Sequence, residues 1–107
     1  NLIYNAIKYS YENKAIKVSI KLKRDLFISI QDKGIGIPEA DQAHIFNRFF
    51  RAKNALHFQG TGIGLNLVKY HAEKLGGQIS FRSKEDKGST FILRLPVIAN
   101  ANNNNRE

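Results

Sequence analysis

Residues 26–38 read Leu26-Phe27-Ile28-Ser29-Ile30-Gln31-Asp32-Lys33-Gly34-Ile35-Gly36-Ile37-Pro38. Leu26, Ile28 and Ile30 occupy every second position, which predicts a strand with one buried face. Asp32 falls in phase with these three residues, so a carboxyl group stands where the pattern favours an apolar side chain. Because a buried carboxylate without a donor is costly, we expect hydrogen-bond donors around Asp32.

The chain changes character after this strand. Gly34, Gly36 and Pro38 predict a turn that leads into a short helix, and proline suits an early helical position. Residues 51–60 have no clear period and are predicted to form a loop. The apolar residues expected on the short helix are Ile45, Phe46, Phe49 and Phe50.

A second glycine-rich segment, Gly60-Thr61-Gly62-Ile63-Gly64, follows the loop. It leads into a helix that is predicted to end near Leu75, just before Gly76-Gly77. Two further strands are predicted after this helix, around Ile79–Phe81 and around Phe91–Leu95.

Two elements are predicted before residue 26. Apolar residues from Ile16 to Leu22 alternate with Lys17, Ser19 and Lys21, which predicts a half-buried strand with a basic outer face. Lys23-Arg24-Asp25 reads as a tight connection between the two strands. The first ten residues, Asn1-Leu2-Ile3-Tyr4-Asn5-Ala6-Ile7-Lys8-Tyr9-Ser10, place their aliphatic residues on one helical stripe.

The order of these elements predicts the fold class. Neighbouring strand pairs favour an antiparallel sheet, so we expect an α+β fold, a two-layer α/β sandwich with the helices on one face. Residues 1–97 are expected to form one domain, and the Asn-rich residues 98–107 a disordered tail. No capping residue precedes Asn1, so the fold is expected to be incomplete at the N-terminus.

Composition excludes several classes. The chain has 107 residues, no cysteine, and 17 Lys and Arg against 9 Asp and Glu, a formal charge of +8. Without cysteine it has no disulfide framework and no thiolate metal site. It lacks an apolar run of about 18 residues, so no membrane span is expected. The positive charge favours an anionic partner or simply a solvated basic surface. Because no basic tract is interleaved with aromatic residues, nucleic acid is not expected as the partner.

The first helix carries one candidate site. Asn1, Asn5 and Lys8 are spaced i, i+4 and i+7, so their side chains project together. A carboxamide oxygen is a hard ligand that suits Mg²⁺, and a lysine one turn on can meet phosphate charge. Taken alone, the same three residues also fit a solvent-facing polar stripe.

The two glycine-rich segments are the other candidates. Asp32 at a strand end can accept a hydrogen bond from an exocyclic amine such as that of adenine, and Gly34 and Gly36 let the backbone approach a flat ligand. Backbone amides of residues 60–65 at a helix start can bind phosphate. Each pattern alone also fits a structural role, an ordinary turn for the first and a flexible linker for the second. The second segment is neither a dinucleotide fingerprint nor a P-loop.

Together and in this order, the motifs resemble the catalytic ATP-binding domain of sensor histidine kinases, in the superfamily of gyrase, chaperone, kinase and mismatch-repair ATPases. The resemblance covers about residues 1–96. Residues 1–10 are similar to the family's N box, 32–38 to its G1 box, 45–51 to its F box and 60–65 to its G2 box. Lys87-Gly88-Ser89-Thr90-Phe91 resembles the motif that opens its last strand.

The resemblance implies a role for each residue of the first helix. Asn5 would ligate Mg²⁺, with Asn1 nearby in the network on the phosphate side. Lys8 would contact phosphate or ribose, and Tyr9 would flank the adenine. Asn5, Lys8 and Arg51 are the expected catalytic residues, and Arg51 would reach the γ-phosphate.

Similar roles are implied further along the chain. Asp32 would accept a hydrogen bond from the adenine amino group, Gly36 would leave room beside the base, and Thr90 would touch the base side through water. Phe46 and Phe49 would support the lid, although both of them, like Tyr9, also fit a core position. The remaining residues expected at the nucleotide are Gly34 and Ile37 in the turn and Gly60, Thr61, Gly62, Gly64 and Leu65 over the phosphates.

One position separates the members of this superfamily. Hydrolases and serine kinases usually carry a glutamate four residues before the magnesium asparagine, where this sequence has Asn1. An amide cannot take a proton at neutral pH, which favours a histidine kinase over an ATP hydrolase or an anti-sigma serine kinase. The second alternative is a non-catalytic nucleotide-binding module, against which the intact motifs argue. His44, His57 and His71 are not followed by the acidic residue typical of an acceptor histidine.

The resemblance also implies partners and a location. The partners would be a separate dimerisation domain that bears the acceptor histidine, and a response regulator. The domain itself would be cytoplasmic and make no direct membrane contact, and the intact protein could be anchored in the bacterial inner membrane.

Overall fold

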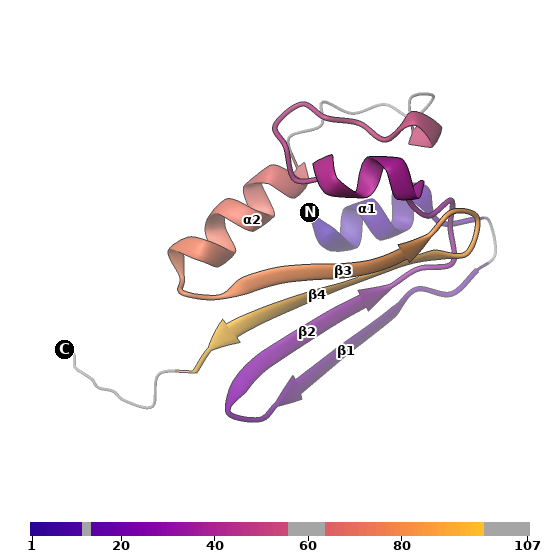
Figure 1. The fold of residues 1–107 in the computed structure, drawn as a ribbon. Helices are drawn as coiled ribbons and strands as arrows, with labels where there is room; N and C mark the ends of the chain where they lie inside the picture. The colour runs from indigo at the N-terminus through magenta and orange to yellow at the C-terminus, as the bar shows by residue number, and fades with distance from the viewer. Residues whose placement is uncertain (12–13, 56–63, 98–107) are drawn as a thin grey trace.

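The computed structural model describes residues 1–11, 14–55 and 64–97. Four antiparallel strands form one sheet, and helices α1 and α2 both lie on the same face of it (Figure 1). The predicted α/β sandwich is therefore confirmed. The elements in chain order are α1 (Leu2–Tyr9), β1 (Lys17–Leu22), β2 (Asp25–Gln31), the 3-10 helices η1 (Glu39–His44) and η2 (Lys53–Ala55), α2 (Gly64–Lys74), β3 (Gln78–Lys84) and β4 (Gly88–Pro96).

The strands follow the order β1-β2-β4-β3, with every neighbouring pair antiparallel. In the centre of the sheet, Ile30 of β2 lies opposite Phe91 of β4, and Phe91 lies opposite Phe81 of β3. Residues directly opposite each other point to the same face, so this row lies beneath the helices. Both β3 and β4 extend beyond the apolar residues from which they were predicted.

The core lies between this row and the helices. Leu2 and Ala6 of α1 pack with Ile30 and Phe91, and α2 adds the partly buried Val68. The i, i+4 spacing of the two α1 residues explains this packing, because it places them on one stripe that faces the sheet.

The predicted Phe-rich helix is not continuous. The 3-10 helix η1 ends at His44, and residues 45–50 form turns in which Asn47 N donates to His44 O and Phe50 N to Asn47 O. Phe49 has φ +67°, a left-handed conformation that no continuing helix accepts. The prediction that placed Ile45, Phe46, Phe49 and Phe50 on one helix is therefore wrong.

The inner face of β1 also differs from its prediction. Val18, Ile20 and Leu22 point to the helix side of the sheet, yet they are 46%, 68% and 69% exposed. Helix α1 packs against β2, and α2 packs against β3 and β4. The helices therefore cover these three strands more fully than they cover the edge strand β1. Within the described ranges, no helix combines the length and hydropathy that a membrane crossing requires.

Candidate functional site

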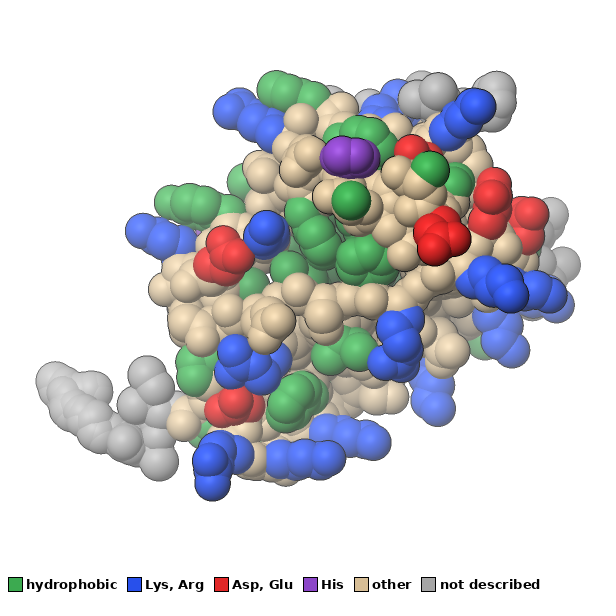
Figure 2. All heavy atoms as spheres, viewed as in Figure 1, with side chains coloured by type: hydrophobic (Ala, Val, Ile, Leu, Met, Phe, Trp, Pro, Cys, Tyr) green, Lys and Arg blue, Asp and Glu red, His purple; other side chains and the backbone are tan. Residues whose placement is uncertain are grey.

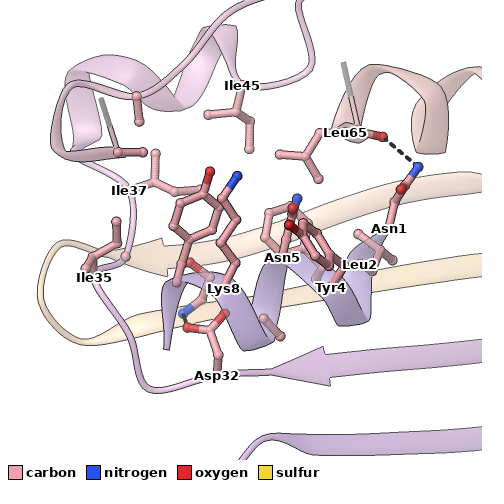
Figure 3. Close-up of a pocket in the computed structure, with 18 of the residues that line it drawn as sticks. Asn1, Leu2, Tyr4, Asn5, Lys8, Asp32, Ile35, Ile37, Ile45 and Leu65 are labelled. Atoms are coloured by element: carbon pink, nitrogen blue, oxygen red, sulfur yellow. Dashed lines mark hydrogen bonds between the residues drawn. The ribbon is translucent and has the colours of Figure 1, made fainter. Parts of the chain in front are cut away.

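A cavity of about 500 Å³ opens between α1, the turn after β2, the segment from Ile45 to Ala55 and the start of α2. Its volume is within the usual range for small-molecule sites. Apolar side chains such as Ile37 and Leu65 form much of the wall, and a few polar groups converge on it (Figure 3). This balance fits a ligand with a flat apolar part and a polar part.

Helix α1 supplies the polar groups along one wall. Asn1, Asn5 and Lys8 all line the cavity, as their spacing predicts. Asn1 Nδ2 lies 3.4 Å from Gly64 O, which joins α1 to the first residue of α2. No described residue hydrogen-bonds with the Asn5 carboxamide, so its oxygen is available to a ligand.

Aromatic rings surround the lysine of this wall. Lys8 Nζ lies 5.2 Å from the centre of the Tyr9 ring and 5.8 Å from that of Tyr4, within reach of cation–π attraction. Both tyrosines line the cavity. Tyr4 was not predicted, and its position one helical turn before Lys8 is the signal that could have indicated it.

Asp32 forms the floor of the cavity. The residue is only 8% exposed, and its Oδ1 accepts hydrogen bonds from Gly34 N at 3.0 Å and Ser89 N at 3.2 Å. Burial raises the pKa of this carboxyl above its usual value, and the two N–H groups oppose that shift to a smaller extent. Among the described residues no donor reaches the second oxygen, Oδ2, which leaves an acceptor for a ligand.

The last strand brings Ser89, not Thr90, to this floor. Ser89 lines the cavity and is 7% exposed, and its Oγ lies 2.7 Å from Ser83 Oγ. Thr90 pairs with Gln31 and Arg82 on the opposite face of the sheet. The reason is the two-residue period of a strand: Ser89 is in phase with the inward-facing Phe91, so the sequence contained this signal.

The two glycines of the turn have different surroundings. A Cβ on Gly34 would lie 1.9 Å from Tyr9 O, and Ile35 N donates to the same carbonyl, so Gly34 allows the turn to pack against the end of α1. Gly34 itself does not line the cavity, contrary to the expectation of ligand contact. Gly36 does line it, together with Ile37, and has φ +65°, which favours glycine.

The segment from Ile45 to Ala55 closes the cavity from above. Arg51 lines it and donates from Nη2 to Ala55 O at 3.0 Å. Asn54 Nδ2 donates to Ile35 O at 3.2 Å and Gly36 O at 3.1 Å, which ties this segment to the turn. Asn54 was not predicted, because nothing in the loop sequence indicates which side chain crosses back.

The phenylalanines of this segment divide between three environments. Phe46 packs edge-on against Phe81 and Phe91 in the core and does not line the cavity. Phe49 is 59% exposed, so it does not support the segment in the described structure, whereas Phe50 lines the cavity.

The second glycine-rich segment is described only from its end. Gly64 and Leu65 open α2 and line the cavity, as expected. The predicted phosphate-binding residues Gly60, Thr61 and Gly62 lie outside the described residues, as does His57. The cavity-lining residues that the sequence did not indicate as ligand contacts are Leu2, Tyr4, Ala6, Ile30, Ile35, Ile45, Phe50, Ala52, Asn54, Ala55, Ser89 and Phe91.

Comparison with known proteins identifies the family. The model for histidine kinase-, DNA gyrase B- and HSP90-like ATPases matches residues 1–99. The chain belongs to this ATPase family. Family membership implies ATP binding, and it confirms the resemblance inferred from the order of the motifs.

Relatives of this ATPase domain are histidine kinases. The signal transduction histidine-protein kinase ArlS of Staphylococcus aureus strain USA300 is 47% identical over 94 residues, which are 85% of this chain and 21% of ArlS. The chain thus spans about a fifth of that relative.

Solved structures agree with this family. A mycobacterial sensor histidine kinase, MprB, is 30% identical with a TM-score of 0.77, covering 86% of this chain and 64% of that one. The catalytic domain of the histidine kinase ThkA is 32% identical with a TM-score of 0.73, covering 89% and 61%.

Proposed function

We propose that this domain binds Mg–ATP in the cavity and, in the intact protein, supplies the γ-phosphoryl group to a histidine of a separate dimerisation domain. The hydrogen bonding of Asp32 supports this proposal most directly. Its Oδ1 is held by two backbone N–H groups, while Oδ2 has no protein donor among the described residues and the residue lines a largely apolar cavity. A fixed acceptor in such a place suits the amino group of adenine.

The base would lie at this end of the cavity. Asp32 would accept from the adenine amino group, and Gly36 and Ile37 would border the plane of the ring. Ser89, whose hydroxyl is within hydrogen-bonding distance of Ser83 Oγ, is placed to support a bridging water on the base side. Tyr9 would flank the ring from α1.

The phosphates would lie toward Asn5 and the start of α2. Mg²⁺ prefers oxygen ligands and usually keeps waters and substrate phosphates in its shell, so one carboxamide is a sufficient protein contribution. The Asn5 carboxamide, unpaired among the described residues, fits this requirement. When bound, the metal would neutralise charge on the phosphates. Lys8 and Arg51 would add positive charge, Arg51 after leaving Ala55 O.

Phosphotransfer to histidine is favoured over hydrolysis by the residue at position 1. Asn1 lies one turn before Asn5, and an amide there cannot act as a general base on water or on a hydroxyl group. A histidine acceptor brings its own nucleophilic nitrogen. His44 and His71, the described histidines, do not line the cavity, so the acceptor is expected on another domain.

Binding is tested by calorimetry with Mg–ATP on the wild-type chain and on Asn5→Ala. We expect Asn5→Ala to weaken the binding of Mg–ATP strongly and that of metal-free ATP little, because only the metal contact is removed. Asn47→Ala is the matched control, since Asn47 is exposed and outside the cavity. Equal affinities of wild type and Asn5→Ala for Mg–ATP would exclude the proposed metal site.

Phosphotransfer is tested in the intact protein, with radiolabelled ATP and chemical stability as the readout. Phosphohistidine is labile in acid and stable in base, so acid-labile label on the dimerisation domain, followed by transfer to a response regulator, is expected. Steady ATP hydrolysis without phosphohistidine would instead assign the protein to the hydrolases of the family. We propose a cytoplasmic location for the domain, because ATP is available there.

A further inference from the structure

The face of the sheet opposite α1 and α2 carries a second set of aligned side chains. Across β1 and β2, Lys21 lies opposite Phe27 and Ser19 opposite Ser29. Across β4 and β3, Thr90 lies opposite Arg82. Residues of a pair share a face, so these side chains form rows across the sheet. They lie on the face opposite α1 and α2, which cover the other face in Figure 1.

These rows surround a hollow of about 260 Å³, which we call the outer groove. Phe27 and Ile92 form an apolar floor, and the hydroxyl groups of Ser19, Ser29 and Thr90 lie around this floor. Lysines lie at the β1 side and an arginine at the β3 side. The residues that line it are Ser19, Lys21, Lys23, Phe27, Ser29, Arg82, Thr90 and Ile92, none of which lines the cavity on the other face.

The charges of this outer groove are not neutralised from within the described protein. Among the described residues, the ion pair joins Arg94 Nη1 to Asp25 Oδ2 at 2.9 Å, and neither residue lines the groove. Lys21, Lys23 and Arg82 have no acidic partner among the described residues. No acidic residue lines the groove. In Figure 2, Lys and Arg side chains gather along the lower part of the molecule, where Figure 1 draws β1 and β2.

We propose that the outer groove is a docking surface for an acidic segment of a protein partner. Carboxylates of the segment would pair with Lys21 and Lys23 at one rim and with Arg82 at the other, and hydroxyl groups would donate to the same carboxylates. An apolar side chain between those carboxylates would fill the floor over Phe27. Charge complementarity favours an acidic partner, and it determines partner choice and association rate more than affinity.

Two other occupants fit the groove less well. A nucleotide-sized molecule is disfavoured because the hollow is smaller than about 300 Å³, the lower end of the usual range for small-molecule sites. Single-stranded nucleic acid is disfavoured because binding without sequence preference uses several aromatic rings for stacking. On the outer face of the four strands Phe27 is the one aromatic residue.

The test is fluorescence anisotropy with a short labelled peptide in which glutamates flank a single leucine, and with the same peptide carrying glutamine in place of glutamate. We expect the glutamate peptide to bind the 107-residue chain and the glutamine peptide not to bind. Lys21→Glu combined with Arg82→Glu should weaken binding about tenfold or more, since like charges then face each other. Saturating Mg–ATP should leave the affinity unchanged, because the sheet separates the two sites.

The matched control is Arg48→Glu combined with Lys74→Glu, which makes the same change of net charge with exposed residues on the helix side. We expect an effect of less than about threefold, and amide shifts from the bound peptide at Ser19, Phe27 and Thr90. The proposal is overturned if the peptide does not bind, if both double variants weaken it equally, or if the shifts map to the helix side. Tighter binding of oligouridylate at the same residues would assign the groove to nucleic acid. A circular dichroism melt of each variant verifies folding.

Discussion

Replacing Asp32 with asparagine separates recognition of the base from stability of the fold. An asparagine can keep Oδ1 as acceptor for the two backbone N–H groups, at 3.0 and 3.2 Å in the wild type. Its Nδ2 then stands where Oδ2 stood, so an acceptor that adenine requires becomes a donor. The variant therefore removes one ligand contact while leaving the shape of the floor unchanged.

The size of the effect follows from the kind of bond that is lost. A hydrogen bond to a charged group contributes about 1.5–3 kcal/mol, which corresponds to a Kd about 10- to 150-fold higher. Inosine triphosphate provides a second measure, because its base has a carbonyl oxygen in place of the adenine amino group. We expect the wild type to prefer ATP over inosine triphosphate and Asp32→Asn to lose or reverse this preference, as measured by calorimetry.

Stability should change in the opposite direction. Burial raises the pKa of Asp32, so the carboxyl group of Asp32 keeps its proton to higher pH in the folded state than in the unfolded chain. The contribution of Asp32 to the free energy of unfolding is therefore fully present below its unfolded pKa and lost as pH rises through the folded pKa. The asparagine side chain stays neutral at every pH. The Asp32→Asn variant should therefore be at least as stable as the wild type at pH 7, and no more stable than the wild type in acid.

Asp86→Asn removes an exposed carboxylate outside the cavity and should leave the Kd for Mg–ATP within about twofold, since distant surface charges are screened. If Asp32→Asn bound ATP as tightly as wild type and still preferred it over inosine triphosphate, the assignment of Asp32 to the base would be wrong. Thermal unfolding at neutral and acid pH checks the stability argument independently.

Three further substitutions test the surroundings of the cavity. Gly34→Ala should lower the free energy of unfolding by about 1–3 kcal/mol in denaturant titrations, because its Cβ would collide with Tyr9 O at 1.9 Å; unchanged stability would mean that the turn shifts freely. Ser89→Ala should weaken Mg–ATP binding, whereas the neighbouring Thr90→Ala should not, and equal effects in calorimetry would contradict the observed strand register. Asn54→Ala should cost about 1–2 kcal/mol of stability, because Gly36 O loses its donor and Ile35 O keeps only Asp86 N; a thermal melt identical to wild type would refute this.

Much of the site could be predicted because local spacing determines it. The i, i+4, i+7 spacing of Asn1, Asn5 and Lys8 places them on one helix face whatever the helix packs against. Asp32 stood out because its phase in β2 required burial, and the structure buries it. The order of the motifs then indicated the family without any knowledge of their distances.

Other residues depended on which surfaces meet. Phe49 and Phe50 are equally apolar in the sequence, yet Phe49 is exposed and Phe50 lines the cavity, because Phe49 has a left-handed backbone conformation that no helical pattern predicts. The amide of Asn54 bridges to Ile35 O and Gly36 O, which lie 19 and 18 residues away in the chain. Contacts between distant segments follow no periodic spacing in the sequence, so no sequence pattern predicts them.

The segment of residues 26–38 shows both what local spacing determines and what only tertiary contacts determine. Its alternation determined by itself that a strand would bury Ile30 and carry a carboxyl to its end, since side chains of a strand alternate between two faces. Gly34 N, two residues on in the turn, donates to that carboxyl within the same segment, whereas only the tertiary structure decided that Ser89 N of β4 would donate to it as well. The physical reason is that periodicity and turns act within one segment, whereas a donor on another strand comes within reach only when the sheet has formed.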